Sequence, residues 1–453
     1  MAKWEILNID PWLKDYENDI NLRMESYERQ KEKLLGDGNK LTEFANAHNY
    51  YGFHKTKTGW IYREWAPNAD GLYLIGDFNG WDRHSHPLRK VNDEDWEIEI
   101  KGIRTLPHKS RIKVLVDANG AIRDRIPLYA TRVERNEDLD YAALIQNPRK
   151  KFKWEDDDFE IQKDDLLIYE AHIGMAGEEG KVSSYKEFEK NVLPRIKKDG
   201  YNTIQLMAIA EHPYYGSFGY QVSNFFAPSS WYGENDELKS LVNACHKEGI
   251  NVIMDLVHSH SVKNTAEGIN EFDGTSFQFF HDGDEGDHPD WDSKLFDYKK
   301  PGVCHFLLSN IKYWLEEYHF DGFRFDGVTS MIYKDHGRGE AFDSYSKYFS
   351  MNTDIEAINY LQLANELIRE IKNDAITIAE DMSGMPGMCL PIEYGGIGFD
   401  YRLAMGMPDF WEKSLEKRDE DWDLSKMWYE LSTHRPEEKR VSYVESHDQA
   451  LVG

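Results

Sequence analysis

The segment GFRFDGV at residues 322–328 places Arg324 and Asp326 at the end of a short apolar run. Three other segments in the second half of the chain also end in polar, mostly acidic residues. These segments are IMDLVHSH (253–260), ITIAED (376–381) and VSYVESHD (441–448). If the four runs are strands of one parallel βα repeat, Asp326, Glu380 and Asp448 meet at one rim of the sheet. That rim is where (β/α)₈ barrels hold their active sites.

Strand-like runs alternate with helical stretches from residue 151 onward, which predicts an α/β fold with a parallel sheet. Helical stretches include SYKEFEKNVLPRIKKDG (184–200) and CHFLLSNIKYWLEEYHF (304–320). The seven candidate strands are LLIYEAHIG (166–174), NTIQLMAI (202–209), INVIMDLV (250–257), DGFRFDGV (321–328), AITIAED (375–381), GIGFDYRLA (396–404) and RVSYVESHD (440–448). The length of this region favours a (β/α)₈ TIM barrel over a doubly wound sheet. Since only seven strands fit, we expect a barrel truncated after strand 7, in a fragment of a longer protein.

Three domains are expected along the 453 residues. Residues 1–50 form a polar, helical N-terminal segment. Residues 51–150 contain short alternating strands and Asn-Gly turns, which indicate a β-sandwich module. Residues 151–453 form the barrel, incomplete at its C-terminus, and residues 261–302 are too long for a simple βα loop and indicate a functional insertion.

The composition limits the classes of partner. Asp and Glu total 82 against 54 Lys and Arg, so the formal charge is −28. Such a charge disfavours nucleic acid and anionic membranes and suits a neutral partner. The three cysteines are far apart and lack metal-ligand spacing, which is typical of free thiols in a reducing compartment. No apolar leader or membrane-length run is evident, so we expect a soluble cytoplasmic protein.

Paired carboxylates predict cleavage of glycosidic bonds. A retaining enzyme of this kind needs a nucleophilic carboxylate and a carboxylic acid about 5–5.5 Å apart. Asp326 and Glu380 both end strands and can reach this separation. Arg324, two residues before Asp326, points to the same side of the strand and would orient Asp326 in its ionised form. A purely structural ion pair is the alternative for Arg324.

The four segments resemble the four signature regions of the family 13 glycoside hydrolases, the α-amylase family. The resemblance implies that Asp326 is the nucleophile, Glu380 the general acid/base and Asp448 the stabiliser of the transition state. It further implies substrate contacts from residues of the same regions and from a tyrosine that stacks on the sugar at the cleavage site. These residues are Asp255, His260, Arg324, His447 and Tyr220. Core packing is the alternative for Tyr220.

Longer motifs around these residues narrow the resemblance to one group of enzymes within the family. GFRFDGVTSMIY, TIAEDMSGMP and YVESHDQALVG are similar to the glycogen (1,4-α-glucan) branching enzymes of the eukaryotic type. REWAPNADGLYLIGDFNGWD resembles the family 48 carbohydrate-binding modules, although Trp65 and Trp81 could equally be sandwich core. The implied activity transfers an α-1,4-linked chain to a 6-hydroxyl of an α-glucan such as glycogen or amylose. An amylase or debranching hydrolase, and a non-catalytic glucan-binding protein, are the alternatives.

Other polar clusters are weaker candidates. His258 and His260 could suggest a metal pair, but a third ligand at convincing spacing is missing. The His and Asp residues at 281–290 could bind a cation, and a solvated loop is the alternative. No phosphate-binding glycine loop follows a strand. We therefore expect neither a metal nor an organic cofactor.

Overall fold

The computed structural model describes residues 3–36, 38–136, 140–339 and 341–452. The chain divides into two compact units. One is Met1–Leu41 with Asp321–Gly453, and the other is Thr42–Phe320. Within the described ranges, no helix is both long and apolar enough to cross a membrane. The predicted domain boundaries at residues 50 and 150 stay predictions.

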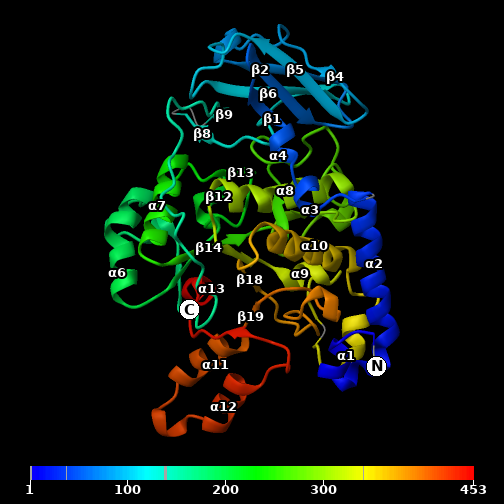
Figure 1. The fold of residues 1–453 in the computed structure, drawn as a ribbon, viewed down its shortest axis with the longest axis vertical. Helices are drawn as coiled ribbons and strands as arrows, with labels where there is room; N and C mark the ends of the chain where they lie inside the picture. The colour runs from blue at the N-terminus through cyan, green and yellow to red at the C-terminus, as the bar shows by residue number, and fades with distance from the viewer. Residues whose placement is uncertain (1–2, 37, 137–139, 340, 453) are drawn as a thin grey trace. The chain divides into compact units, whose positions relative to one another are not determined.

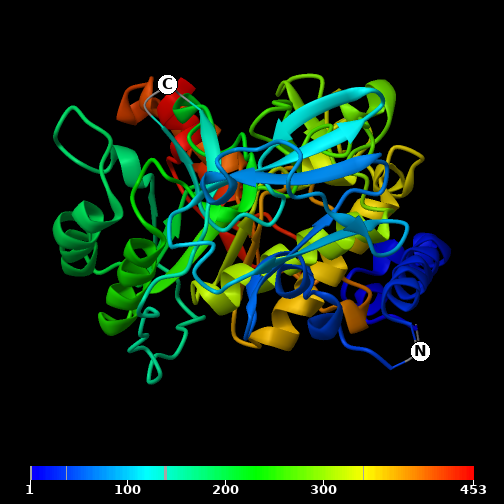
Figure 2. The same cartoon turned by 90° about the horizontal axis from the view of Figure 1, so that it is seen from above.

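Two antiparallel sheets form the β-sandwich of the second unit (Figures 1 and 2). Their strands alternate between buried and more exposed residues, most clearly in β6, because successive side chains point to opposite faces of a sheet. One sheet has the order β1 (Gly52–Lys55), β2 (Gly59–Trp65), β5 (Asp95–Lys101), β4 (Arg89–Lys90). The other has the order β3 (Gly71–Gly76), β6 (Arg111–Ala118), β9 (Tyr141–Leu144), β8 (Val133–Arg135), with β7 (Ala121–Arg125) beside β6.

Asn79 stabilises the turn after β3. Its Oδ1 accepts hydrogen bonds from the backbone N–H groups of Gly76 at 3.1 Å and Trp81 at 3.2 Å. Its Nδ2 donates to the carbonyl of Leu74 at 3.2 Å. A Cβ on Gly76 would lie 2.3 Å from the Arg111 carbonyl, so only glycine fits there. These residues of the module therefore have structural roles in the turn.

Trp65 joins the sandwich to the insertion that follows β14. Its buried ring meets Phe279 edge-on, with the ring centroids 5.1 Å apart. Its carbonyl accepts from Nε2 of Gln278 at 2.8 Å. A Cβ on Gly302 would lie 2.3 Å from the Trp65 ring. Trp65 is thus a core residue, which favours the structural alternative for this tryptophan.

Three parallel strands follow in the same unit: β10 (Ile168–Ala171), β11 (Thr203–Leu206) and β14 (Asn251–Leu256). Helix α7 (Asn235–Lys247) precedes β14. The predicted helix at 184–200 is divided into α5 (Tyr185–Glu187), a π-helical turn (Phe188–Val192) and α6 (Leu193–Lys198). Pro194 explains the division, since it lacks the N–H that a continuous helix needs. Gly200 and Gly249 end α6 and α7 with φ of 88° and 70°, as predicted.

Two antiparallel hairpins extend this unit. β12 (Ala210–Glu211) pairs with β13 (Asn224–Pro228). β15 (His260–Val262) pairs with β16 (Ser293–Leu295), and the predicted insertion at 261–302 contains most of β15 and all of β16. The insertion is therefore anchored at both of its ends.

Four parallel strands belong to the other unit: β17 (Gly322–Phe325), β18 (Ile376–Ala379), β19 (Tyr401–Leu403) and β20 (Arg440–Val441). β17 and β18 are buried at every position, as expected for parallel strands covered on both faces. The connecting and terminal helices are α9 (Val328–Ile332), α10 (Ile355–Ile371), α11 (Gly406–Leu415), α12 (Leu424–Ser432) and α13 (His447–Val452). Every one of the seven predicted strand segments thus contains a strand.

The N-terminal segment is helical, as predicted. It comprises α1 (Ile6–Ile9), a 3₁₀ turn (Pro11–Tyr16) and α2 (Glu17–Leu35), followed by α3 (Leu41–Phe44) and α4 (Ala47–Tyr50). Helix α2 packs against α10 of the same unit (Figure 1). Asn359 on α10 donates to Ser26 on α2 at 2.9 Å. The N-terminal helix is therefore part of the unit that carries Asp326 and Glu380.

Candidate active site

Asp326 and Glu380 come directly after two neighbouring parallel strands. Phe325 pairs with Ala379 in the ladder between β17 and β18. The backbone N–H of Glu380 donates to the Phe325 carbonyl at 3.1 Å and extends this ladder by one residue. The two carboxylates therefore lie side by side at the carboxyl ends of their strands, as predicted.

A single guanidinium bridges the two carboxylates. Nη1 of Arg324 lies 2.8 Å from Oδ1 of Asp326, and Nη2 lies 3.2 Å from Oε1 of Glu380. The second oxygen of Glu380 accepts a hydrogen bond of 2.6 Å from the N–H of Gly327. Gly327 has φ of 63°, a left-handed conformation that glycine adopts readily. Arg324 and Gly327 thus fix both oxygens of Glu380.

The environment of Glu380 favours its protonated form. Burial raises the pKa of Glu380 to about 7, against the lowering effect of the Arg324 guanidinium. The neighbouring carboxylates of Asp326 and Asp448 contribute to this raised pKa, and the hydrogen bond from Gly327 opposes it. A carboxylic acid that is still protonated near neutral pH can donate a proton to a leaving group.

The position of Asp448 corrects the prediction that it ends a strand. Strand β20 already ends at Val441, and Asp448 lies in the first turn of α13. The backbone N–H of Asp448 donates to Oγ of Ser446 at 3.3 Å, and its Oδ1 lies 3.3 Å from Nε2 of His447. A turn of helix thus takes the place of a strand end, yet Asp448 still acts on the pKa of Glu380.

Asp381, directly after Glu380, holds the loop that begins there. Its Oδ1 accepts from Oγ1 of Thr329 at 2.8 Å and from Oγ of Ser383 at 2.6 Å. Its Oδ2 accepts from the N–H groups of Gly384 at 3.1 Å and Met385 at 3.3 Å. This role of Asp381 was not predicted, because the sequence shows only an acidic pair in TIAED and not the partners of its second member.

Tyr220, Asp255 and His260 form a second cluster, in the other unit. Oη of Tyr220 donates to Oδ2 of Asp255 at 2.6 Å, and Nε2 of His260 lies 2.7 Å from the Tyr220 carbonyl. Asp255 lies on β14 and His260 begins β15, and both are buried. The three residues are thus brought together by one strand, one hairpin and one loop.

Trp291 lies beside this cluster and was not singled out from the sequence. Its ring centroid is 5.0 Å from that of His260, and it stacks on His288 at 3.9 Å. Gln221 donates to its carbonyl at 3.0 Å, and 38% of the tryptophan is exposed. A single tryptophan in an Asp-rich segment forms no periodic pattern. The sequence therefore could not indicate that this ring would be exposed beside His260.

The suspected metal ligands have other partners. Nε2 of His258 lies 2.9 Å from Oδ1 of Asn310, and burial lowers the pKa of His258 to about 4. In the insertion, Asp287 forms ion pairs with Lys294 at 2.9 Å and Lys263 at 3.5 Å. His258 is thus a neutral core residue, and Asp287 is already compensated by protein cations.

Two family models match the chain. "Carbohydrate-binding module 48 (Isoamylase N-terminal domain)" matches residues 50–130. "Alpha amylase, catalytic domain" matches residues 190–294 and 271–453. The predicted sandwich module and the fold class of the catalytic part are therefore confirmed.

Similar curated proteins include two 1,4-alpha-glucan-branching enzymes from fungi. A 1,4-alpha-glucan-branching enzyme of Rhizophagus irregularis is 47% identical over 99% of this chain and 67% of its own length. That of Yarrowia lipolytica is also 47% identical, over 99% of this chain and 68% of its own length. The chain thus spans about two thirds of the length of these relatives. A solved pullulanase from Bacillus acidopullulyticus has the same fold, with a TM-score of 0.64 at 19% identity over 88% of this chain and 52% of the pullulanase. The chain belongs to the alpha-amylase family and, within it, to the 1,4-alpha-glucan-branching enzymes.

Proposed function

We propose that this protein cleaves α-1,4 links of a glucan and transfers the released chain to a 6-hydroxyl, with Asp326 as nucleophile and Glu380 as general acid/base. The names of its relatives support the overall reaction. Glycogen and amylose are the proposed substrates. The roles of the individual residues are argued from the chemistry of their surroundings.

In the first step, a carboxylate oxygen of Asp326 attacks the anomeric carbon and the bond to the 4-oxygen of the departing chain breaks. Glu380 gives its proton to that oxygen, and a glycosyl ester of Asp326 remains. Glu380 then accepts the proton of a 6-hydroxyl, whose oxygen attacks the anomeric carbon and releases Asp326. Two inversions retain the α configuration in the new α-1,6 link.

The observation that carries this assignment is the Arg324 guanidinium between the two carboxylates. It contacts Asp326 at 2.8 Å and Glu380 at 3.2 Å, so it orients the nucleophile and the acid together. Burial and the carboxylates of Asp326 and Asp448 keep the pKa of Glu380 at about 7. An ionised nucleophile beside a protonated acid is the arrangement that a retaining mechanism needs.

The remaining predicted residues are proposed to bind the sugar at the cleavage site. Asp448 would stabilise positive charge on the ring, with His447 beside it. The cluster of Tyr220, Asp255 and His260 would contribute an aromatic face and hydrogen-bond partners.

We further propose a cytoplasmic location, because all three cysteines are free thiols. Cell fractionation followed by immunoblotting tests this location.

A hydrolase on the same scaffold is the alternative, since the same carboxylates serve water or a sugar as acceptor. Incubation with amylose separates the two reactions. Branching shifts the iodine absorbance without releasing new reducing ends, whereas hydrolysis releases them in proportion. A protein that binds glucan without catalysis changes neither signal.

The Glu380→Gln variant tests the assigned acid. It should lose transfer from amylose, because an amide cannot protonate the departing oxygen. It should still react with α-glucosyl fluoride, whose leaving group needs no proton, and the glycosyl ester on Asp326 should be detected by mass spectrometry. Retention of most of the branching rate on amylose would show that another residue is the acid.

A further inference from the structure

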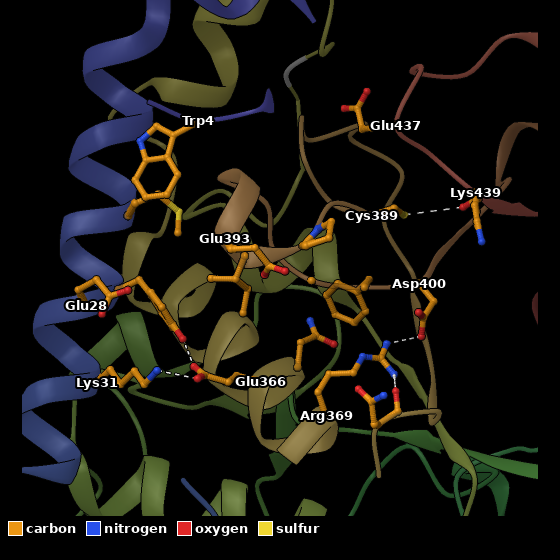
Figure 3. A pocket seen from close by; sticks show the side chains of 18 residues that line it. Trp4, Glu28, Lys31, Glu366, Arg369, Cys389, Glu393, Asp400, Glu437 and Lys439 are labelled. Atoms are coloured by element: carbon orange, nitrogen blue, oxygen red, sulfur yellow. Dashed lines mark hydrogen bonds and ion pairs between the residues drawn. The ribbon is translucent and has the colours of Figure 1, made fainter. Parts of the chain in front are cut away.

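A cavity of about 620 Å³ lies in the unit that contains the N-terminal helix (Figure 3). Its volume is within the range of about 300–1,000 Å³ that small-molecule sites occupy. Helices α2 and α10 contribute one part of the wall, and the loop between β18 and β19 contributes another. Among the lining residues are Trp4, Tyr27, Asn365, Phe399 and Glu437, and neither Asp326 nor Glu380 is among them. This N-terminal pocket is therefore separate from the proposed catalytic carboxylates.

Two cations of the N-terminal pocket are compensated by acidic residues of its wall. Lys31 on α2 forms an ion pair of 2.6 Å with Glu366 on α10. Arg369, one turn further along α10, forms an ion pair with Asp400 (Figure 3). Oδ2 of Asp400 also accepts from the N–H of Thr377 at 2.9 Å. Three further carboxylates of the wall, those of Glu28, Glu393 and Glu437, form no ion pair within the described residues. The wall therefore disfavours an anionic ligand and favours one that brings hydrogen-bond donors.

Two buried acceptors in the wall lack a donor among the described residues. Asn365 is only 1% exposed, and although its Nδ2 donates to the Ile397 carbonyl at 3.1 Å, its Oδ1 has no hydrogen-bond partner there. Glu437 accepts from the N–H of Gly387 at 3.2 Å through Oε1, while its Oε2 is buried and likewise unmatched. An unmatched buried acceptor destabilises the folded protein, so these two oxygens favour a ligand that brings O–H donors.

Apolar ring surface completes the wall. The Trp4 indole is partly exposed and is held by a hydrogen bond of 2.9 Å from Nε1 to Asn21. Tyr27 and Phe399 are buried and line the same cavity. Flat rings beside hydrogen-bond acceptors match the two kinds of surface on a sugar, its apolar faces and its hydroxyl rim.

We propose that the N-terminal pocket binds glucose units of an α-glucan chain, as a second glucan site apart from the catalytic carboxylates. The surplus carboxylates of the wall exclude an anionic ligand, and the unmatched oxygens of Asn365 and Glu437 select one rich in hydroxyls. The choice of a glucan among such ligands rests on the proposed function. A chain bound here would tether the enzyme to its polymeric substrate.

Cys389 provides a local reporter for this pocket. It is the only half-buried cysteine of the three, and it lines the cavity. Burial raises the pKa of the Cys389 thiol, so its alkylation is slow and is followed over hours at alkaline pH with excess N-ethylmaleimide. Peptide mass spectrometry of the alkylated protein then measures occupancy of the pocket and not of the catalytic site. The Glu380→Gln background prevents turnover of the probe, maltoheptaose. At about four times the dissociation constant, mass action predicts about fivefold slower alkylation.

Variants on one helix supply the matched comparison. Glu28 lines the pocket from the exposed side of α2, and Glu28→Trp should fill its entrance and abolish protection by maltoheptaose. Glu25→Trp introduces the same residue three positions away, at a site that does not line the pocket, and should keep full protection. Asn365→Leu should weaken protection by removing the unmatched acceptor. If the Asn365→Leu variant fails to fold, the comparison of Glu28→Trp with Glu25→Trp still tests the proposed site.

The outcomes separate this site from the proposed function. Equal alkylation rates with and without maltoheptaose overturn the site, even if the protein branches amylose. Protection that Glu28→Trp leaves unchanged also overturns it. Protection by spermidine but not by maltoheptaose shows that the ligand is a cation and overturns the assigned class. Specific protection in a protein that does not branch amylose supports the site and rejects the catalytic proposal alone.

Discussion

The charge state of Glu380 should control the pH dependence of the proposed reaction. The acid must be protonated in the first step, and its pKa is about 7 because of burial and the carboxylates of Asp326 and Asp448. We expect kcat on amylose to fall as pH rises through about 7. Asp448→Asn removes one of the carboxylates that raise this pKa, so the alkaline limb of its residual activity should move to lower pH.

Measurement of initial rates between pH 5 and pH 9 checks this prediction, with Asp374→Asn as the control because Asp374 is an exposed carboxylate before β18. An alkaline limb that stays in place in Asp448→Asn would show that Asp448 does not act on Glu380.

The same carboxyl group should make stability depend on pH. The pKa of Glu380 is raised in the folded state from an ordinary value of 4.5 to about 7. Its contribution to the free energy of unfolding is therefore fully present below about pH 4.5 and is lost as pH rises through about 7. Glu380→Gln should gain stability relative to the parent over this interval, by at most about 3.5 kcal/mol at about 1.4 kcal/mol per pH unit.

Denaturant unfolding of both proteins at pH 5 and pH 8 measures that difference. A constant difference between the two pH values would contradict the raised pKa.

Arg324 should not be replaceable by lysine. Its two nitrogens contact two different carboxylates, and an ammonium group offers no such planar fork. Arg324→Lys should lower kcat about 10²-fold, the effect typical of misplaced reacting groups, and leave KM for amylose nearly unchanged. Arg418→Lys, at an arginine whose side chain is 82% exposed, is the control and should have no effect. Near-normal kcat in Arg324→Lys would reduce Arg324 to a structural ion pair.

At the scale of elements, the contact between α8 (Pro301–Glu317) and the sandwich should determine how the substitution Gly302→Ala changes the stability of the protein. Alanine is a better helix former than glycine by about 1 kcal/mol, so Gly302→Ala should stabilise an isolated helix. Its Cβ, however, would lie 2.3 Å from the Trp65 ring. Overpacking of this kind costs about 1–3 kcal/mol, so we expect net destabilisation.

Thermal unfolding of Gly302→Ala, alone and with Trp65→Phe, checks this prediction, because the smaller ring should restore part of the loss. Gly180→Ala has nothing within 4 Å of the new Cβ and is the control. A higher melting temperature in Gly302→Ala would show that helix propensity outweighs the contact.

For the whole molecule, the charge of −28 should make stability depend on salt. Surplus carboxylates repel one another in the compact state. Raising NaCl from 10 to 150 mM shortens the Debye length from about 30 Å to about 8 Å and should raise the melting temperature by a few degrees. KM for the neutral substrate amylose should stay within about twofold, since no ion pair forms with it. A melting temperature that falls with salt would show that attractive ion pairs dominate the surface.

The sequence by itself determined the local chemistry and the class of fold. Alternation of apolar runs with helices predicted all seven parallel strands, because burial of a βα repeat requires that pattern. The spacing of Arg324 and Asp326 placed both side chains on one side of β17, and the 2.8 Å contact confirms it. Residues adjacent in the chain, or at the ends of regular elements, are set by local geometry.

Only the tertiary structure decided what depends on contacts between distant segments. It placed Asp448 in a helical turn. It also packed Trp65 against Phe279 and Gly302. Asp381 likewise acquired its role in the loop after Glu380 through a contact with a distant residue, Thr329. The N-terminal pocket likewise joins α2 to residues more than 300 positions away in the chain. Such contacts leave no periodic trace in the sequence, because a side chain's partners across the core are chosen by packing.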